Sequence, residues 1–280
     1  MKASNASASP TALPVTRSLS LVYVFSLVIA LLMAIASVAG LVYSARFYET
    51  EALQQSYVAN DVVNLFIGLP ILLGAMWLAR RGKLLGLLFW PGALFYVFYN
   101  ATAYTFGLPL TIAFLLSLLQ LTLSAYTTIA LVASIDGEAV QQRLNGAVPE
   151  RLVGGALVGA GLLFFLLAMS MLIEGMASNA PIVEGAYATS VADLCIVPAW
   201  IIGGVQLWQR KPLGYISGTG LLFQGSMLFI GLIVFFILQP LLTTAPFALM
   251  DTVVISIMSL IVFIPFALFL RGVVLQGERS

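Results

Sequence analysis

Long apolar runs broken by short polar segments dominate the pattern along the chain. A run of about 20 uncharged, mainly apolar residues is long enough to cross a bilayer as a helix. Eight such runs are present, and the expected spans cover residues 20–43, 59–79, 84–106, 108–134, 152–173, 188–208, 213–238 and 249–270. Only a tight turn after Gly107 separates the third span from the fourth. The pattern therefore predicts an all-α integral membrane protein with eight transmembrane helices.

The basic residues between these spans predict an orientation. Lysine and arginine are enriched in the cytoplasmic loops of membrane proteins. When both termini are placed in the cytoplasm, all of the 12 basic residues except Arg46 fall on the inner side. A wrong number of spans would scramble this bias, so it also favours an even number. We expect a multi-pass protein of the plasma (inner) membrane with both termini cytoplasmic.

Two stretches of the chain align without gaps at a shift of 128 residues. They read PILLGAMWLARRGKLLGLLFWPGALF and PAWIIGGVQLWQRKPLGYISGTGLLF, and 7 of the 26 positions are identical. The identities include a proline, a lysine and two glycines, which hydrophobic bias alone does not reproduce. They pair Pro70 with Pro198, Lys83 with Lys211, Gly86 with Gly214 and Gly92 with Gly220. We interpret them as two parallel four-helix repeats, and convergence of loop chemistry is the alternative.

The segments outside the spans complete the expected domain organisation. The first residues are small and polar and contain prolines, which is typical of a disordered tail. We expect a disordered cytoplasmic tail at 1–19, a first repeat at 20–134, a cytoplasmic linker at 135–151, a second repeat at 152–272 and a cytoplasmic tail at 273–280.

The stretch ARRGKLLGLLFWPGALFYVFYN, with its partner WQRKPLGYISGTG, resembles an uncharacterised family of prokaryotic multi-span membrane proteins. The resemblance is a loose pattern over roughly half of the chain. It implies the membrane class and brings no assigned activity with it.

Composition excludes several classes of function. Hydrophobic residues make up 61% of the chain and charged residues 8%, whereas soluble domains are about 25% charged. The net charge of +1 does not point to a nucleic-acid partner. The chain has no histidine and a single cysteine, Cys195, which excludes histidine-based triads, imidazole-bound haem or zinc, and an intrachain disulfide. We expect no catalytic residue, metal site or cofactor.

Asp193 is the main candidate for a functional residue, because an ionisable group inside a span is costly. On the expected boundaries it lies about 7 to 8 Å below the outer end of its span. Pro198 follows five residues later and cannot bond the carbonyl of Leu194, and Pro70 likewise frees that of Phe66 at a matched depth. We expect local helix breaks at both prolines. Asp193 would carry a proton or a small cation, and a buried acid used only for packing is the alternative.

Further polar residues complete the candidate ligand- or ion-binding set. Asn64 is nearly the partner of Asp193 in the aligned repeats, and Tyr96 and Asn100 share one side of the third span. We expect the two asparagines to orient a ligand. Tyr99 and Tyr104 fit an interfacial aromatic belt.

Three more polar residues belong to this candidate set, and each also has a purely structural explanation. Asp61 opens the second expected span, where capping of the helix N-terminus is the first explanation. Gln120 and Gln224 lie centrally in their spans, and hydrogen bonds between helices explain them first.

The function that suits these features is that of a permease or exporter. A small solute would bind at an outward-facing site, with coupling to protons or a cation. The alternative is a non-catalytic accessory or sensing subunit of a membrane complex, and an unfamiliar lipid-modifying activity is a third reading. Besides the bilayer, the expected partner is a small solute or cation, and a second copy or a partner subunit stays open.

Overall fold

The computed structural model describes residues 13–178 and 184–277. Within them, eight helices are long and apolar enough to cross a membrane. They are α1 (Ser20–Val42), the continuous unit of α3 (Glu51–Val63), η1 (Asn64–Gly68) and α4 (Leu69–Arg80), α5 (Leu84–Gly107), α6 (Ile112–Ser134), α8 (Glu150–Ser178), α9 (Glu184–Trp208), α10 (Pro212–Leu242) and α11 (Leu249–Gly277). Each overlaps one expected span, so the all-α, multi-pass class is confirmed.

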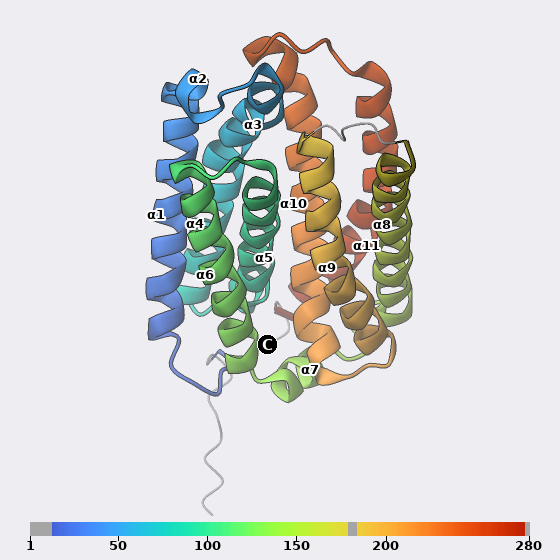
Figure 1. The fold of residues 1–280 in the computed structure, drawn as a ribbon. Coiled ribbons are helices and arrows are strands. Elements are labelled where there is room, and N and C mark those ends of the chain that lie inside the picture. Colours follow the sequence, from blue (N-terminus) through green and yellow to red (C-terminus); the bar gives the residue numbers. More distant parts are fainter. Residues whose placement is uncertain (1–12, 179–183, 278–280) are drawn as a thin grey trace, which may run out of the picture.

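Two short helices mark the two ends of the bundle (Figure 1). Helix α2 (Ser44–Phe47) lies at one end and α7 (Gly137–Leu144) at the other. The described parts of the chain begin and finish at the α7 end. The α4–α5 turn, with Arg81 and Lys83, and the α9–α10 turn, with Arg210 and Lys211, also lie at the α7 end.

The second span begins eight residues earlier than its apolar run predicts. Helix α3 starts at Glu51, because the Thr50 hydroxyl caps it by accepting from the N–H of Leu53 at 3.2 Å. Asp61 therefore lies ten residues inside the helix, and the predicted capping role is wrong.

The tail expected at 1–19 is ordered over its last part. The N–H of Thr16 donates to the carbonyl of Ser134 at 2.9 Å, and the N–H of Asp136 donates to that of Pro14 at 2.8 Å. The disorder prediction is therefore wrong for 13–19, and residues 1–12 lie outside the described residues. At the other terminus, α11 continues to Gly277 through most of the segment expected to be a tail, and 278–280 lie outside the described part.

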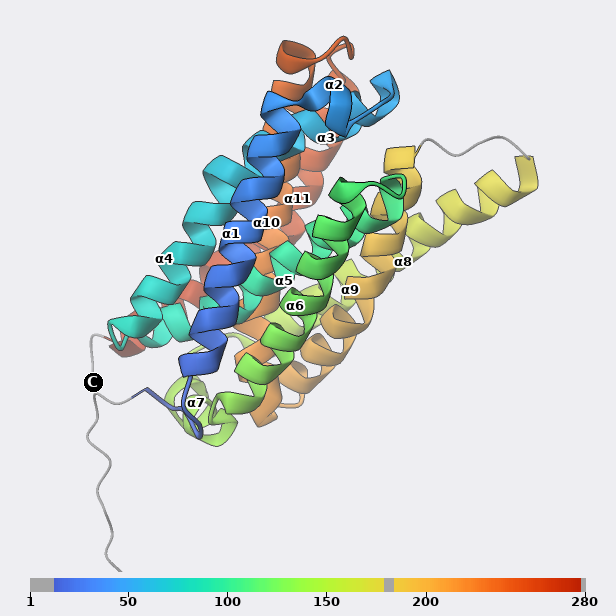
Figure 2. The ribbon, with the colours of Figure 1, turned by 60° about the vertical axis from the view of Figure 1, so that its left-hand side comes forward.

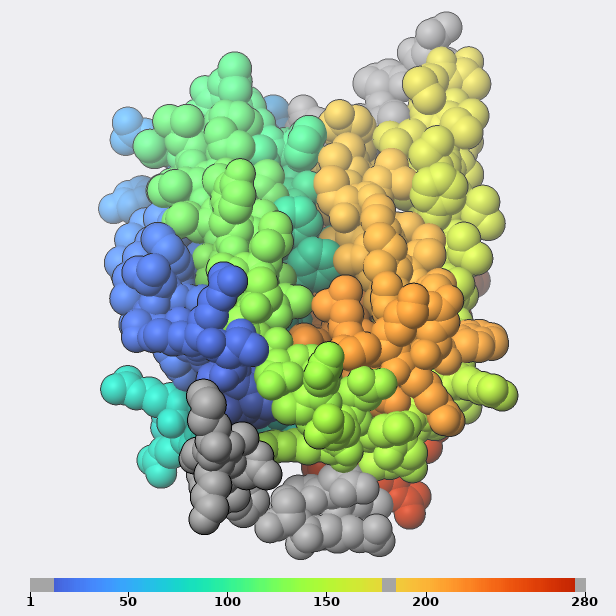
Figure 3. Space-filling model, turned by 90° about the horizontal axis from the view of Figure 1, so that it is seen from below, coloured from blue at the N-terminus to red at the C-terminus, as the bar shows by residue number. Residues whose placement is uncertain are grey.

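Helices α5 and α10 form the centre of the bundle, between α1, α4 and α6 on one side and α8, α9 and α11 on the other (Figures 1 and 2). They cross where Gly92 meets Gly220, and each glycine is eight residues from the start of its helix. Phe89 of α5 stacks on Phe223 of α10 beside the crossing, with ring centroids 4.2 Å apart. Figure 3, a view from the α7 end, shows blue and green residues of the first half beside orange residues of the second half, with the yellow-green segment that includes α7 at the boundary between them.

The turn after α4 and the turn after α9 share one conformation, 128 residues apart. Gly82 and Arg210 both have positive φ, 74° and 56°, and Arg210 is the one non-glycine residue with positive φ among the described residues. The backbone bonds match as well: Gly82 to Ala79 and Arg210 to Leu207 are both 2.9 Å, and Lys83 to Leu78 and Lys211 to Gln206 are 3.0 and 2.9 Å. The pairs aligned in sequence are thus also alike in local geometry.

Candidate functional site

A cavity of about 360 Å³ lies between the first four and the last four spans. Helices α3 and α5 line it from the first group, and α8, α9, α10 and α11 line it from the second. It extends from Gly185, one residue into α9, down to Trp200, and so it faces the α2 end of the bundle. Figure 2 shows α8 diverging from α9 toward that end.

The wall of this cavity is mainly apolar and aromatic, with its polar groups gathered on one side. Phe164 contacts Trp200 and Phe229, with ring centroids 5.8 and 5.9 Å apart. Trp200 lies seven residues beyond Asp193 along α9, or about 10 Å nearer the α7 end. The aromatic cluster therefore closes the cavity on that side. The polar side chains come chiefly from α3, α5 and α9, and include Asn60, Tyr96, Tyr99, Asn100, Ser190 and Asp193.

Asp193 is the acidic residue among the side chains that line this cavity. Helix α9 begins at Glu184, earlier than its apolar run predicts, so Asp193 lies nine residues inside it, or about 14 Å from its start. The carboxylate is therefore farther from the start of its helix than the 7 to 8 Å expected. The phenol of Tyr99 lies beside it as a hydrogen-bonding partner. No basic side chain forms an ion pair with Asp193 in the part of the chain that the structure describes.

The two prolines expected to break helices behave differently. Helix α9 continues through Pro198 without interruption, so the break predicted there is wrong. Before Pro70 the chain forms a π-turn, in which the N–H of Leu69 donates to the carbonyl of Asn64, five residues earlier. Such π-bulges are frequent at functional sites. This one lies at Asn64, a candidate residue.

Asp61 lies at the centre of a buried hydrogen-bond network on the side of α5 that faces α1 and α6. Its side chain is 1% exposed. Tyr48 donates its hydroxyl to one carboxylate oxygen at 2.5 Å, and Tyr104 donates to the other at 2.9 Å. Burial, with the Asp61 carboxylate as the next cause, holds the pKa of Tyr48 well above its ordinary value of 10.0, so that this phenol stays a donor.

A second, much smaller cavity of about 20 Å³ adjoins Asp61. It lies between α1, α3, η1, α5 and α6, wholly inside the first four spans. The candidate residues Asn64, Asn100 and Gln120 line it together with Asp61. Asn100 lines both cavities, and it accepts a hydrogen bond from the amide of Asn60 at 3.1 Å.

The candidate residues therefore divide into two neighbouring groups and one outlier. Tyr96, Asn100 and Asp193 line the large cavity, and Asp61, Asn64, Asn100 and Gln120 line the small one. Tyr96 joins the groups, because its hydroxyl donates to Asn64 Oδ1 at 3.3 Å. Gln224 lies apart and accepts from Trp200 Nε1 at 2.8 Å across the α9–α10 contact, which confirms the predicted bond between helices.

Sequence reasoning missed several members of these networks. The interfacial belt predicted for Tyr104 is wrong, because this side chain is buried and donates a hydrogen bond to Asp61. Tyr48 lies in the loop before α3, where nothing in its neighbourhood along the chain signals a role. Asn60, one residue before Asp61, is the one partner that spacing along the second span could have found.

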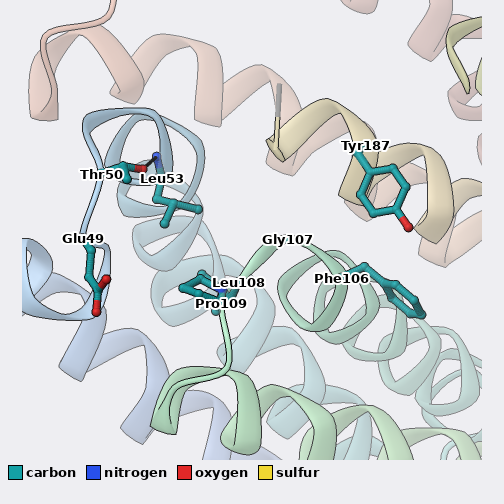
Figure 4. Close-up of a pocket in the computed structure, with 8 residues that line it drawn as sticks. All are labelled: Glu49, Thr50, Leu53, Phe106, Gly107, Leu108, Pro109 and Tyr187. Atoms are coloured by element: carbon teal, nitrogen blue, oxygen red, sulfur yellow. Dashed lines mark hydrogen bonds between the residues drawn. The ribbon is translucent and has the colours of Figure 1, made fainter. Parts of the chain in front are cut away.

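A surface hollow of about 480 Å³ at the α2 end lacks converging polar groups. Its lining comes from the α2–α3 loop, the α5–α6 loop and the start of α9. Figure 4 shows Glu49 and Tyr187 on opposite sides, with Leu108 and Pro109 between them and the Glu49 carboxylate pointing away from Tyr187. The hydroxyl of Thr50 is used by its own helix cap. These polar groups therefore do not converge on one point.

No protein-family model, curated protein or solved structure matches the chain. The features that indicate a function are therefore the two cavities and their polar side chains. Of the two, the one beside Asp193 has the size of a small-molecule pocket, which is about 300 to 1,000 Å³.

Proposed function

We propose that the protein is a permease or exporter that binds a small amphipathic solute in the cavity beside Asp193. The observation that carries this proposal is the composition of that cavity. One carboxylate and one phenol, Asp193 and Tyr99, sit in a mainly apolar, aromatic chamber of about 360 Å³. Apolar walls with a few placed polar groups are typical of small-molecule sites.

The chemistry of the cavity selects the class of solute. A carboxylate with no basic partner at this depth is stabilised by a cationic ligand that supplies the missing charge. The rings of Phe164, Trp200 and Phe229 match an apolar body and attract a cation through their π faces. A hydrophobic amine, with its ammonium group at Asp193, satisfies both requirements. In its absence the acid would take up a proton, which links binding to proton movement.

Duplication and orientation support a transport role. The shared geometry of the turns around Gly82 and Arg210 supports two parallel repeats, and the crossing at Gly92 and Gly220 lies where an axis between them would run. The basic residues at the α7 end favour a cytoplasmic position for that end and for both termini. The cavity then faces outward and is closed toward the cytoplasm by Trp200 and its neighbours. Rocking of one repeat against the other would reverse this access.

Ligand-dependent thermal stability tests the proposal. Purified wild type, Asp193→Asn and Tyr99→Phe are melted with a panel of hydrophobic primary, tertiary and quaternary amines. A ligand at 100 times its Kd adds about 2.7 kcal/mol to the stability of the fold. We expect at least one amine to raise the Tm of wild type, with the effect lost in Asp193→Asn. Asp251→Asn, the same change at an exposed helix start, is the matched control and keeps the response.

Uptake by proteoliposomes then separates transport from binding. The stabilising amine, radiolabelled, should accumulate with wild type and not with Asp193→Asn. Binding without movement would favour the sensing subunit. If no amine stabilises wild type, or if Asp193→Asn responds as wild type does, the cavity is not the solute site and the accessory role becomes the better account.

A further inference from the structure

The small cavity beside Asp61 differs from the large cavity beside Asp193 in its size and in its buried polar lining. It measures about 20 Å³, and about 10 to 15 Å³ suffices for one water-sized occupant. Its lining is dominated by polar side chains that are almost fully buried: Ser37 2%, Asp61 1%, Asn64 6%, Asn100 8%, Ser117 5% and Gln120 8% exposed. These residues come from α1, α3, η1, α5 and α6. Five elements thus converge on a space for one small particle.

The carboxylate of Asp61 has the bonding pattern of an ionised acid. Tyr48 and Tyr104 donate to its two oxygens, and Ser37 lies against it as a further partner. Hydrogen bonds accepted by both oxygens favour the ionised form of a carboxylate, whereas burial disfavours that form unless a cation lies near. No basic side chain forms an ion pair with it among the described residues. Since the uncompensated charge of a buried ion is costly, a cation in the adjoining space would stabilise this arrangement.

The other lining groups present oxygen atoms with unused lone pairs. Asn64 Oδ1 and Asn100 Oδ1 each accept one hydrogen bond, from Tyr96 and Asn60, and a carbonyl oxygen can accept a second interaction. Ser117 donates its proton to the backbone of α6 at 2.8 Å, which leaves its oxygen lone pairs free.

Gln120 is the residue that points most directly to a ligand. Its side chain is 8% exposed, lines the cavity and has no hydrogen-bond partner among the described residues. Polar groups inside a protein are normally satisfied, and the cavity that Gln120 lines gives space for a partner of its amide. The expected pairing of Gln120 with a neighbouring helix is not found.

We propose that these oxygen atoms form a binding site for one sodium ion between Asp61, Asn64, Asn100, Ser117 and Gln120. Hard cations prefer carboxylate, carbonyl and hydroxyl oxygens. A single carboxylate neutralises a monovalent ion, whereas a divalent ion would leave a net positive charge inside the bundle. The small volume favours sodium over potassium. A water molecule is the competing occupant, because it fits the same space.

The sodium site lies apart from the solute cavity but shares one wall with it. Asn100 lines both cavities. An ion that fixes the orientation of its side-chain amide therefore also fixes which amide atom faces a solute in the large cavity. Coupling of the two sites rests on the proposed function. The sodium site itself does not, since its occupancy needs no solute.

Thermal melting in different chloride salts tests the site without any solute. Wild type, Asp61→Asn, Gln120→Leu and Asp193→Asn are melted over a series of NaCl concentrations, with choline chloride keeping the ionic strength constant, and again with KCl. We expect NaCl to raise the Tm of wild type and of Asp193→Asn more than KCl or choline does. Gln120→Leu should need about tenfold more sodium for the same shift, which corresponds to about 1.4 kcal/mol.

Gln120→Leu keeps the test decisive if Asp61→Asn does not fold, because it removes one oxygen and breaks no hydrogen bond. Equal responses of wild type to sodium, potassium and choline would mean that the cavity holds water, and the site would be rejected. A sodium response that is unchanged in Gln120→Leu, or lost only in Asp193→Asn, would place the ion elsewhere and overturn the proposal too. Neither result depends on whether an amine binds beside Asp193.

Discussion

The close approach of α5 and α10 depends on the missing side chain of Gly92. A Cβ atom added there would meet the carbonyl oxygen of Gly220, and would lie 2.9 Å from its carbonyl carbon and 3.0 Å from its Cα. Non-bonded carbons are in contact at about 3.5 to 4.0 Å, so the two carbon contacts alone require the helices to separate by about 0.5 to 1.1 Å. The contact with the carbonyl oxygen is closer still and requires at least the upper part of that range. The opposing atoms are backbone and cannot rotate away. Gly92→Ala should therefore disturb the whole crossing.

The cost follows from overpacking, which is typically about 1 to 3 kcal/mol. Against it, alanine gains about 1 kcal/mol over glycine in helix propensity. Gly74→Ala measures that gain alone, because a Cβ added at Gly74 meets nothing within 4 Å. We expect Gly92→Ala to be less stable than Gly74→Ala by about 1 to 3 kcal/mol. Gly220→Ala should fall between them, since its Cβ would lie 3.3 Å from the nearest atom, the backbone nitrogen of Gly92.

The assay is the Tm of each variant in one detergent at one heating rate, followed by intrinsic fluorescence. The expected order of Tm is Gly74→Ala, then Gly220→Ala, then Gly92→Ala as the lowest. A Gly92→Ala protein that melts at or above Gly74→Ala would falsify the tight crossing. If Gly92→Ala and Gly220→Ala lower the Tm equally, a Cβ atom at Gly92 does not make closer contacts than one at Gly220.

Two further changes test local geometry in the same assay. Gly82→Ala should lower stability by about 1 to 2 kcal/mol, because Gly82 has φ 74° in the α4–α5 turn, and an unchanged Tm would contradict that conformation. Trp90→Phe should cost more than about 1 kcal/mol, because it removes the hydrogen bond that the buried indole N–H donates to Ser26 Oγ at 3.1 Å, worth about 1 kcal/mol, and also leaves a cavity. A double-mutant cycle with Ser26→Ala checks this value, and additive losses would mean that the bond contributes nothing.

The sequence determined the class and the number of spans, because both depend on each residue's own preference for lipid. A backbone in the hydrocarbon core must satisfy its polar groups within the segment. Each long apolar run therefore becomes a helix whatever its neighbours are. Most span boundaries followed for the same reason, and the second span shows where this fails. Its first turns, EALQQSYVAND, are too polar to be recognised from hydropathy, and contacts hold them in place, such as Gln239 Nε2 to the carbonyl of Gln55 at 2.9 Å.

The candidate residues were found because polar groups are rare and costly in spans. Asp193, Asn100 and Tyr96 were selected on that ground, and all three line the large cavity. Their division between two sites could not be predicted, since it depends on how each helix is rotated about its axis. Asp61 is the clearest case. Read from its neighbours it looked like a cap, whereas its partner Tyr104 lies 43 residues away on α5.

Only the tertiary structure decided which polar groups meet and what space they leave. The volume beside Asp193 is set by the diverging paths of α8 and α9 and by the rings of Phe164, Trp200 and Phe229. The space beside Asp61 is set by five elements at once. A sequence pattern reports how each residue partitions between water and lipid. The fit between helices depends on the packing of all the side chains together, and that fit defines the two sites.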